Sequence, residues 1–220
     1  MTTSITMTDL KVLHSPEIYL FNSEQRQFGA NVLKDFLYYI KFTGKKGLIN
    51  FSFSANEDGL HQNLSIKENY ILDAVPSSLI KNSEDNFIHT SENLTNPHLK
   101  DLIARTNCIE RLVKDLEREE RKLVGIVKTI LSNSEYIFMD SPDKFISPET
   151  LAIIKAALEY ESSHNNRKVF LKAATKERWL DIVTHWISKD ESGRFTKSKN
   201  QLLSKPNNQT SNVVELKKAS

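Results

Sequence analysis

The sequence is poor in cysteine and lacks long apolar runs, and each absence excludes a class of protein. Cys108 is the only cysteine among 220 residues, which excludes an internal disulfide framework. It falls in an apolar helical stripe, where we expect a small core residue. No apolar run approaches the roughly 20 residues that span a bilayer. With no signal peptide visible, we expect a cytoplasmic protein that reaches the inner face of a membrane only through a partner.

Charge and histidine spacing exclude further classes. The formal net charge of +2 is too mild to predict a nucleic-acid partner. Six histidines are present, but none forms an H-x-H or H-x-x-x-H pair, so the sequence offers no metal site. No G-x-S-x-G motif occurs, so the local motif of a serine nucleophile is absent as well.

The first third of the chain predicts a strand, a helix and a second strand. The segment "EIYLF", residues 17–21, is a short run of β-prone residues. The segment "VLKDFLYYIKF", residues 32–42, places apolar side chains at helical spacing. After a glycine-containing break, "LINFSFS" at residues 48–54 is typical of another strand. This order is that of a βαβ unit.

The middle of the chain, about residues 60–130, predicts a helical subdomain. Ser65 followed three positions later by Glu68 is a capping-box pattern, so we expect a helix to begin there. Between Lys100 and Ser132 there is no proline, and apolar residues recur at near-heptad spacing. One long helix, two helices joined by a turn, and a short coiled coil all fit this pattern.

The remainder returns to alternating strands and helices. Residues 136–139, "YIFM", and 168–174, "KVFLKAA", predict buried parallel strands, with a helix between them that starts at Ser147. The segment "HWISKDESGRF", residues 185–195, predicts a hairpin. From Thr196 onward polar residues dominate, and we expect a disordered tail.

This alternation predicts an α/β fold over residues 1–195, with a mostly parallel sheet, crossover helices and the helical subdomain. The order of elements resembles the ATPase subunit of ABC transporters over roughly residues 17–195. The stretch "EREERKLVGIVKTILSNSEYIFMDSP" aligns without a gap on that family's signature helix and Walker B strand. The resemblance implies a P-loop-NTPase-like fold.

The resemblance also implies where a nucleotide would bind, and there the motifs are altered. The Walker A position is "SEQRQFGAN", with Gly29 in place of the lysine and with Ala30 and Asn31 in place of the Ser/Thr pair. A phosphate loop needs glycines, so that backbone amides can wrap the phosphates, and a lysine to neutralise their charge. Only one glycine is present in this stretch, and Asn56 replaces the glutamine of the Q-loop.

The motifs of the second half are altered as well. Where the family has Ser-Gly-Gly in its signature, this chain has Glu117, Arg118 and Glu119, whose two carboxylates would repel a phosphate. Asp140 of Walker B is kept, but Ser141 replaces the glutamate that positions the attacking water. Loss of general-base assistance costs about 10²–10⁴-fold in rate. The D-loop aspartate and the switch histidine are replaced by Ser147 and Thr175, respectively.

We therefore expect a catalytically degenerate ABC-type ATPase-like subunit that acts as a structural or regulatory binding partner. By resemblance it would pair with an intact ABC ATPase or with itself, and would contact an integral membrane subunit. The contact surface is expected in the helical region after residue 60. It would include residues 59–70, with Gly59, Leu60, His61, Leu64 and Tyr70 as candidates, and the helices around residues 76–116. No cofactor is expected, with ATP and Mg²⁺ as the only ligands that the resemblance leaves open.

Two alternatives remain open at this point. A divergent ATPase would take positive charge from Arg26, Lys34 or Lys41, and a carboxylate from Asp143 or Glu149. A helical interaction protein, with an accidental α/β pattern, is the other alternative.

Overall fold

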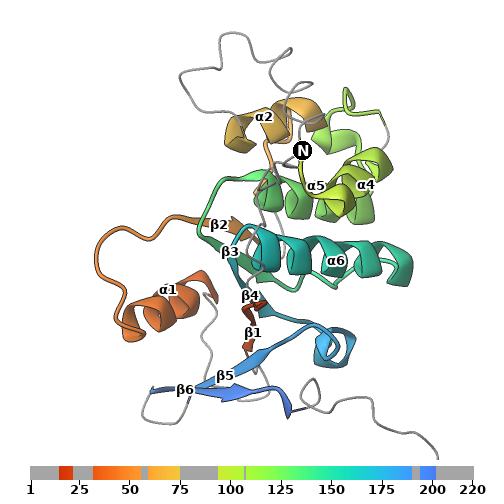
Figure 1. Cartoon of the computed structure of the whole chain (residues 1–220). Helices are drawn as coiled ribbons and strands as arrows, with labels where there is room; N and C mark the ends of the chain where they lie inside the picture. Colours follow the sequence, from red (N-terminus) through yellow and green to blue (C-terminus); the bar gives the residue numbers. More distant parts are fainter. Residues whose placement is uncertain are drawn as a thin grey trace, which may run out of the picture.

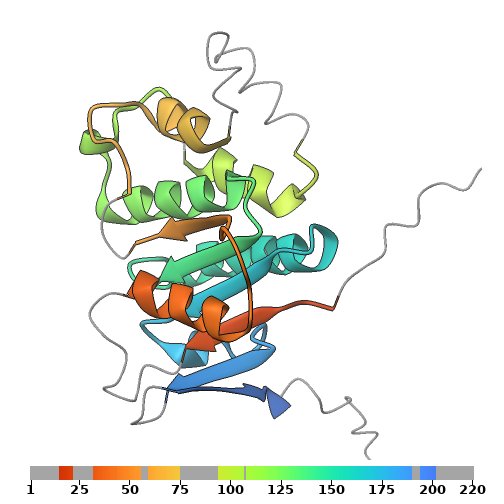
Figure 2. The same ribbon diagram turned by 90° about the vertical axis from the view of Figure 1, so that its left-hand side faces the viewer.

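A six-stranded sheet forms the centre of the molecule in the computed structural model (Figures 1 and 2). The structure describes residues 15–21, 32–55, 59–74, 94–106, 108–189 and 194–201. The spatial order of the strands is β2-β3-β4-β1-β5-β6, in which the first five run parallel and β6 pairs antiparallel with β5. The strands are β1 (Ile18–Phe21), β2 (Phe51–Ser54), β3 (Tyr136–Asp140), β4 (Lys168–Lys172), β5 (His185–Lys189) and β6 (Phe195–Lys199).

Helices cover the two faces of the sheet unequally. Helix α1 lies on one face, α6 lies on the opposite face, and α2, α4 and α5 gather beside the end of the sheet that holds β2 (Figure 1). The helices are α1 (Val32–Phe42), α2 (Ile66–Ala74), α4 (Pro97–Arg105), α5 (Arg118–Leu131) and α6 (Pro148–His164), with short 3-10 turns at Val113–Asp115 and Lys176–Trp179. This architecture confirms the predicted α/β class, and a helical interaction protein is therefore wrong.

The central strands bury different chemistry on their two faces. Because side chains alternate along a strand, Ile137 and Met139 of β3 join an aliphatic core shared with α5 and α6. Tyr136 and Phe138 point the other way, into an aromatic core under α1. Strands β1 and β4 repeat the alternation, and the rings of Tyr19 and Phe170 stack at 4.6 Å. Burial on both faces explains why these strands are continuous apolar runs.

The helical subdomain shares the aliphatic core of the sheet. Ser65 caps α2 with Glu68 as predicted, through bonds of 2.7 and 3.1 Å. Of the alternatives for residues 100–132, the structure has two separate helices, α4 and α5, so a single long helix and a coiled coil are wrong. The expectation that Cys108 is a core residue of a helix is also wrong. It is exposed in the connection between these helices, with a φ of 48°.

The end of the described chain requires a second correction. Thr196, where we expected the disordered tail to begin, lies in β6, since Phe195–Lys199 pair with Lys189–His185. The side chain of Phe195 is buried in the aromatic core, and this apolar anchor explains why a strand otherwise rich in lysine and polar residues is ordered. In the part of the chain that the structure describes, no helix is long and apolar enough to cross a membrane.

Lysines outnumber acids on the face that carries α1. Each of four acidic side chains there forms an ion pair with a lysine: Glu17 with Lys168, Asp35 with Lys189, Glu135 with Lys45, and Asp140 with Lys172. Strand alternation and the position of α1 put further lysines on this side, namely Lys34, Lys41, Lys197 and Lys199. Among the described residues, this face is therefore basic.

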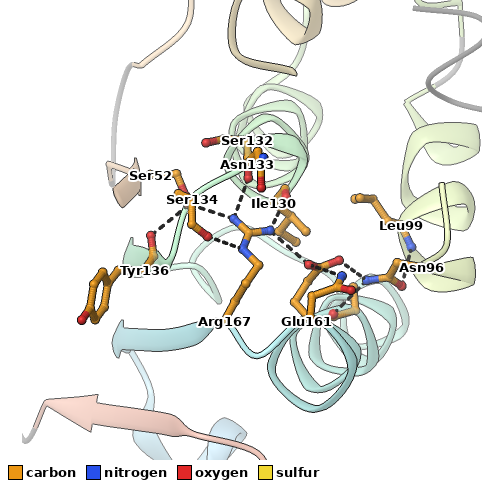
Figure 3. Close-up of polar contacts among 12 residues, drawn as sticks. Ser52, Asn96, Leu99, Ile130, Ser132, Asn133, Ser134, Tyr136, Glu161 and Arg167 are labelled. Atoms are coloured by element: carbon orange, nitrogen blue, oxygen red, sulfur yellow. Dashed lines mark hydrogen bonds and ion pairs between the residues drawn. The ribbon is translucent and has the colours of Figure 1, made fainter. Parts of the chain in front are cut away.

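The buried side chain of Arg167, directly before β4, joins the sheet to helices α5 and α6 (Figure 3). Its guanidinium donates to the carbonyl oxygens of Ile130, Ser132 and Ser134, at 2.6, 2.7 and 2.8 Å. It also bonds the hydroxyl of Ser134 at 2.8 Å and the carboxylate of Glu161 at 3.1 Å. All five N–H donors of the guanidinium thus have an acceptor. The positive charge lies at the carboxyl end of α5, where the helix dipole favours it.

Glu161 and Asn96 extend this network into the helical subdomain. Asn96 donates its amide to Glu161 at 2.9 Å and to the carbonyl of Ala157 at 3.0 Å, so it is held on α6 (Figure 3). Its side-chain oxygen accepts from the backbone amides of His98 and Leu99, which makes it the N-cap of α4. One chain of hydrogen bonds therefore fixes α4, α5 and α6 relative to strand β4.

We predict that Arg167→Met will lower the free energy of unfolding by about 3–5 kcal/mol, because it leaves the Glu161 carboxylate buried without its cation. Arg167→Lys keeps the charge but loses the planar fork, so we expect an intermediate loss. Urea denaturation measures both. The control is Lys155→Met, which removes the ion pair with the exposed Asp181 and should cost no more than about 1 kcal/mol. Equal losses for Arg167→Met and this control would contradict the prediction.

Candidate functional site

The carboxyl ends of the parallel strands meet at one edge of the sheet, where ligands bind in open α/β folds. Strand β3 ends at Asp140 and β4 ends at Lys172, and these two residues are register partners. Ser141 follows directly after Asp140, and Thr175 lies shortly after β4. The strand register thus places Asp140 and Ser141, which the family resemblance assigns to the nucleotide site, at the same edge as the end of β4, shortly before Thr175.

The carboxylate of Asp140 has one hydrogen-bond donor and one ion-pair partner within the chain. The Ser141 hydroxyl donates to its Oδ1 at 2.8 Å, and the Lys172 ammonium lies 3.9 Å from the same oxygen. The backbone of Ser141 takes a φ of 52°, and its amide donates to the Lys172 carbonyl at 2.6 Å. A hydroxyl and an ammonium group thus both lie next to Oδ1 of Asp140.

Asp143 holds the loop that follows β4. Its carboxylate is 1% exposed and accepts from the backbone amides of Ala174 at 2.9 Å and Thr175 at 2.7 Å. Arg178 adds bonds to the carbonyl oxygens of Asp143 and Ile146, at 2.8 and 3.1 Å. The position that the family resemblance assigns to the switch histidine is therefore tied by its backbone to the loop after β3.

The acidic residues at the start of α5 have structural partners. Glu117 and Glu120 form a reciprocal capping box at the first turn of the helix. The Arg111 guanidinium bonds Glu120 at 2.7 Å and lowers the pKa of that carboxyl. Glu119 accepts from the backbone amide of Ser147 at 2.9 Å, which connects α5 to the N-cap of α6.

Arg118 completes the contact between α5 and the loop after β3. Its guanidinium carbon lies 3.6 Å from the centre of the Phe145 ring, within the range of a cation–π contact. The three predicted signature positions, Glu117, Arg118 and Glu119, therefore contact their own helix and the loop of residues 141–147.

A cavity of 660 Å³ lies between β2 and α5, and we call it the β2–α5 groove. Its described lining combines basic, hydroxyl-bearing and apolar side chains and contains no acidic one: Phe51, Ser52, Phe53, Ser54, Ala55, Gly59, Leu60, Leu72, Arg118, Arg121, Lys122, Gly125, Lys128, Thr129, Ser132 and Phe145. Strand β2 is the last strand on this side of the sheet, so its outer edge faces the groove. Lys122 bonds the Ala55 carbonyl and Lys128 the Gly59 carbonyl, each at 3.0 Å.

The groove contains only part of the predicted contact surface. Gly59 and Leu60 line it, whereas the exposed His61 and the half-buried Leu64 do not. The prediction that Tyr70 belongs to the contact surface is wrong, because its side chain is fully buried in the aliphatic core and offers no surface to a partner.

Several predicted positions lie outside the described residues: Arg26, Gly29, Ala30, Asn31 and Asn56. Among the residues that the structure describes, no group of three or more His, Cys, Asp or Glu side chains could hold a metal ion.

The groups invoked for a divergent ATPase, apart from Arg26, lie on different elements: Lys34 and Lys41 on α1, Asp143 in the loop after β3, and Glu149 on α6. Asp143 is occupied by two backbone amides, and Glu149 lies in the first turn of α6. Lys41 lies in the last turn of α1, whereas a phosphate would bind at the first, and Lys34 lies over the ring of Tyr38 at 5.5 Å. Sequence reasoning missed the contact of Lys172 with Asp140, although the predicted parallel pairing of β3 and β4 would have placed both residues at one edge.

Solved structures with the same fold are ATP-binding cassettes. The ATP-binding subunit of an ABC transporter matches with a TM-score of 0.57 and 12% identity, covering 85% of this chain and 80% of the other. A nucleotide-free ATP-binding cassette from an ABC transporter gives 0.54 and 14%, covering 87% and 85%. A dimeric post-hydrolysis state of an ATP-binding cassette bound to ADP and Pi gives 0.59 and 12%, covering 84% and 85%.

These similarities show the fold alone. The chain has the α/β fold of ABC ATPases, a P-loop NTPase architecture, as the resemblance implied. No protein-family model matches the sequence, and no curated protein matches it.

We predict that Asp143→Ala will release the loop after β4, because the amides of Ala174 and Thr175 lose a charged acceptor that contributes roughly 1.5–3 kcal/mol. Hydrogen-exchange protection of these two amides should fall by roughly ten- to hundredfold. Glu149→Ala, at an exposed position of α6, is the matched control and should leave their protection unchanged. Unaltered protection in Asp143→Ala would show that the carboxylate does not hold the loop.

Proposed function

We propose that this chain is a catalytically inactive ABC-ATPase-like subunit that serves as a structural or regulatory binding partner in an ABC-type membrane complex. The observation that carries the proposal is the arrangement at Asp140. The Walker-B-type carboxylate of Asp140 accepts a hydrogen bond from Ser141 and lies 3.9 Å from the Lys172 ammonium, and the following position has a hydroxyl where a hydrolase needs an acid.

Glycine spacing supports the absence of a phosphate loop anywhere in the chain. The six glycines are Gly29, Gly44, Gly47, Gly59, Gly125 and Gly193. No two of them are five positions apart, so the sequence contains no G-x-x-x-x-G segment. Without that spacing, backbone amides cannot form the phosphate cradle of a P-loop.

The start of α5 supports the same proposal. A helix N-terminus can bind an anion when its amides and its surroundings are accessible. Here the side chains of Glu117 and Glu120 cap the first turn, and Arg118 covers Phe145. These contacts stabilise one closed arrangement of the helix and the loop after β3, which suits a scaffold better than a site that opens and closes on nucleotide.

The β2–α5 groove is the surface that we assign to the partner. Its size is within the range of binding pockets, and it exposes Leu72 and Phe145 by 42% and 38%. Exposed apolar side chains rimmed by polar groups are typical of protein-interaction sites. By analogy with the cassettes of the same fold, the partners would be an intact ABC ATPase or a second copy of this chain, together with an integral membrane subunit.

Nucleotide binding can be tested by thermal unfolding with MgATP. A ligand at one hundred times its Kd stabilises a protein by about 2.7 kcal/mol, which is roughly 5–10 °C for a chain of this length. We expect no measurable shift in Tm and no ATP turnover above background. Asp140→Asn should behave like the original chain in both assays. Hydrolysis that Asp140→Asn abolishes would overturn the proposal in favour of a divergent ATPase.

Partner binding can be tested through Gly125, which lines the groove. A Cβ added at Gly125 meets only Ser54 Oγ at 3.9 Å, an ordinary contact, so Gly125→Ala should fold normally and retain the partner. Gly125→Phe projects a ring into the groove and should lower the amount of partner recovered by at least tenfold. Affinity purification from the native cell followed by mass spectrometry measures this amount. Retention of an intact ATPase and a membrane subunit by Gly125→Phe would refute the assignment of the groove.

A further inference from the structure

Large apolar side chains are exposed on one segment of the chain. The described residues contain six exposed large hydrophobic side chains, and four of them lie between residues 38 and 51. Tyr38 is 49% exposed, Phe42 is 59% exposed and Leu48 is 98% exposed. We call residues 38–48 the α1 patch. The segment runs along the outer side of α1 and then towards β2, across the face turned to the viewer in Figure 2.

The backbone holds the end of this patch away from the core. Helix α1 ends with bonds from the Thr43 amide to the Tyr39 carbonyl and from the Gly44 amide to the Lys41 carbonyl, each 3.0 Å long. Gly44 and Gly47 have φ values of 88° and 86°, and a Cβ at either position would meet no atom within 4 Å. Leu48 follows this open turn, which explains its nearly complete exposure.

The charge of the patch is positive. Lys41 and Lys46 are exposed beside the apolar residues, and no acidic residue occurs in the sequence from Phe36 to Asn56. Lys45 pairs with Glu135 at 2.7 Å, and the surrounding α1 face contributes more lysines than acids. The combination of exposed Leu, Phe and Tyr side chains with lysines is typical of surfaces that bind anionic lipid.

The shape of the patch favours a bilayer over a peptide. Neither the β2–α5 groove nor the second described cavity, of 600 Å³, is lined by Tyr38, Phe42 or Leu48. A protein segment that buried these side chains would need a complementary concave surface, whereas a lipid interface adapts to a convex one. In a bilayer, Leu48 would reach the acyl boundary, Tyr38 would lie at headgroup level, and the lysines would extend to the phosphates.

We propose that the α1 patch binds directly to anionic lipid bilayers as a peripheral membrane contact. The contact does not depend on a partner protein, so it holds or fails independently of the function proposed above. It differs from the expectation that the chain reaches a membrane only through a partner.

The test is flotation of the purified full chain with vesicles of phosphatidylcholine alone or of phosphatidylcholine and phosphatidylglycerol in equal parts. We expect binding to the anionic vesicles only, and weaker binding as salt is added, because salt screens the lysines. Leu48→Ser should weaken binding about tenfold, since it removes one buried apolar side chain. Lys41→Gln combined with Lys46→Gln should weaken it roughly thirtyfold.

Matched controls keep the experiment decisive. Leu72→Ser removes an exposed apolar side chain of the β2–α5 groove, and Lys114→Gln removes an exposed lysine of the helical subdomain. Both should bind anionic vesicles like the original chain, and circular dichroism confirms that each variant is folded. Equal binding to neutral and anionic vesicles, or equal losses in patch and control variants, would overturn the proposal. Absence of binding to the anionic vesicles would also overturn it.

Discussion

The buried guanidinium of Arg167 is the interaction on which the arrangement of the helices depends. It fixes the carboxyl end of α5 through three backbone carbonyls and holds the Glu161 carboxylate of α6. Asn96, the N-cap of α4, bonds Ala157 and Glu161 and so connects α4 to α6. A buried charge with complete hydrogen bonding tolerates little displacement, because each lost bond leaves a desolvated polar group. The helical subdomain is therefore held on the sheet by this hydrogen-bond network as well as by apolar burial.

This anchoring has a consequence at the other end of α5. The helix is continuous from Arg118 to Leu131, so its start is placed beside the loop after β3 once its end is fixed. There, Glu119 and Arg118 contact Ser147 and Phe145. The carboxylate of Glu119, which would repel a phosphate, instead joins two elements of the same chain. Under the function that we propose, Arg118 and Glu119 at the signature positions thus have two effects. They remove a phosphate contact, and they hold α5 against the loop after β3.

Local signals in the sequence predicted most of the fold. Helix α1 has the predicted bounds of residues 32–42, and the caps at Ser65 and Ser147 are present, because helix periodicity and capping act over a few residues. The order of β6 and the exposure of Cys108 could not be predicted, since each depends on contacts with distant segments. The same holds for the site. Asp140 and Ser141 follow from one motif, whereas the bonds of Asp143 to Ala174 and Thr175 join residues more than 30 positions apart.

Strand β2 connects the two surfaces to which we assign binding. Phe51 lines the β2–α5 groove, and its ring also stacks on Phe138 of the aromatic core at 5.4 Å. The α1 patch ends at Leu48, only three residues before Phe51, so the groove and the patch are adjacent along the chain. A membrane subunit held in the groove would therefore bring lipid close to the exposed lysines and apolar side chains of the patch. Two contacts that are each weak alone reinforce one another in such an arrangement, because the first raises the effective concentration for the second.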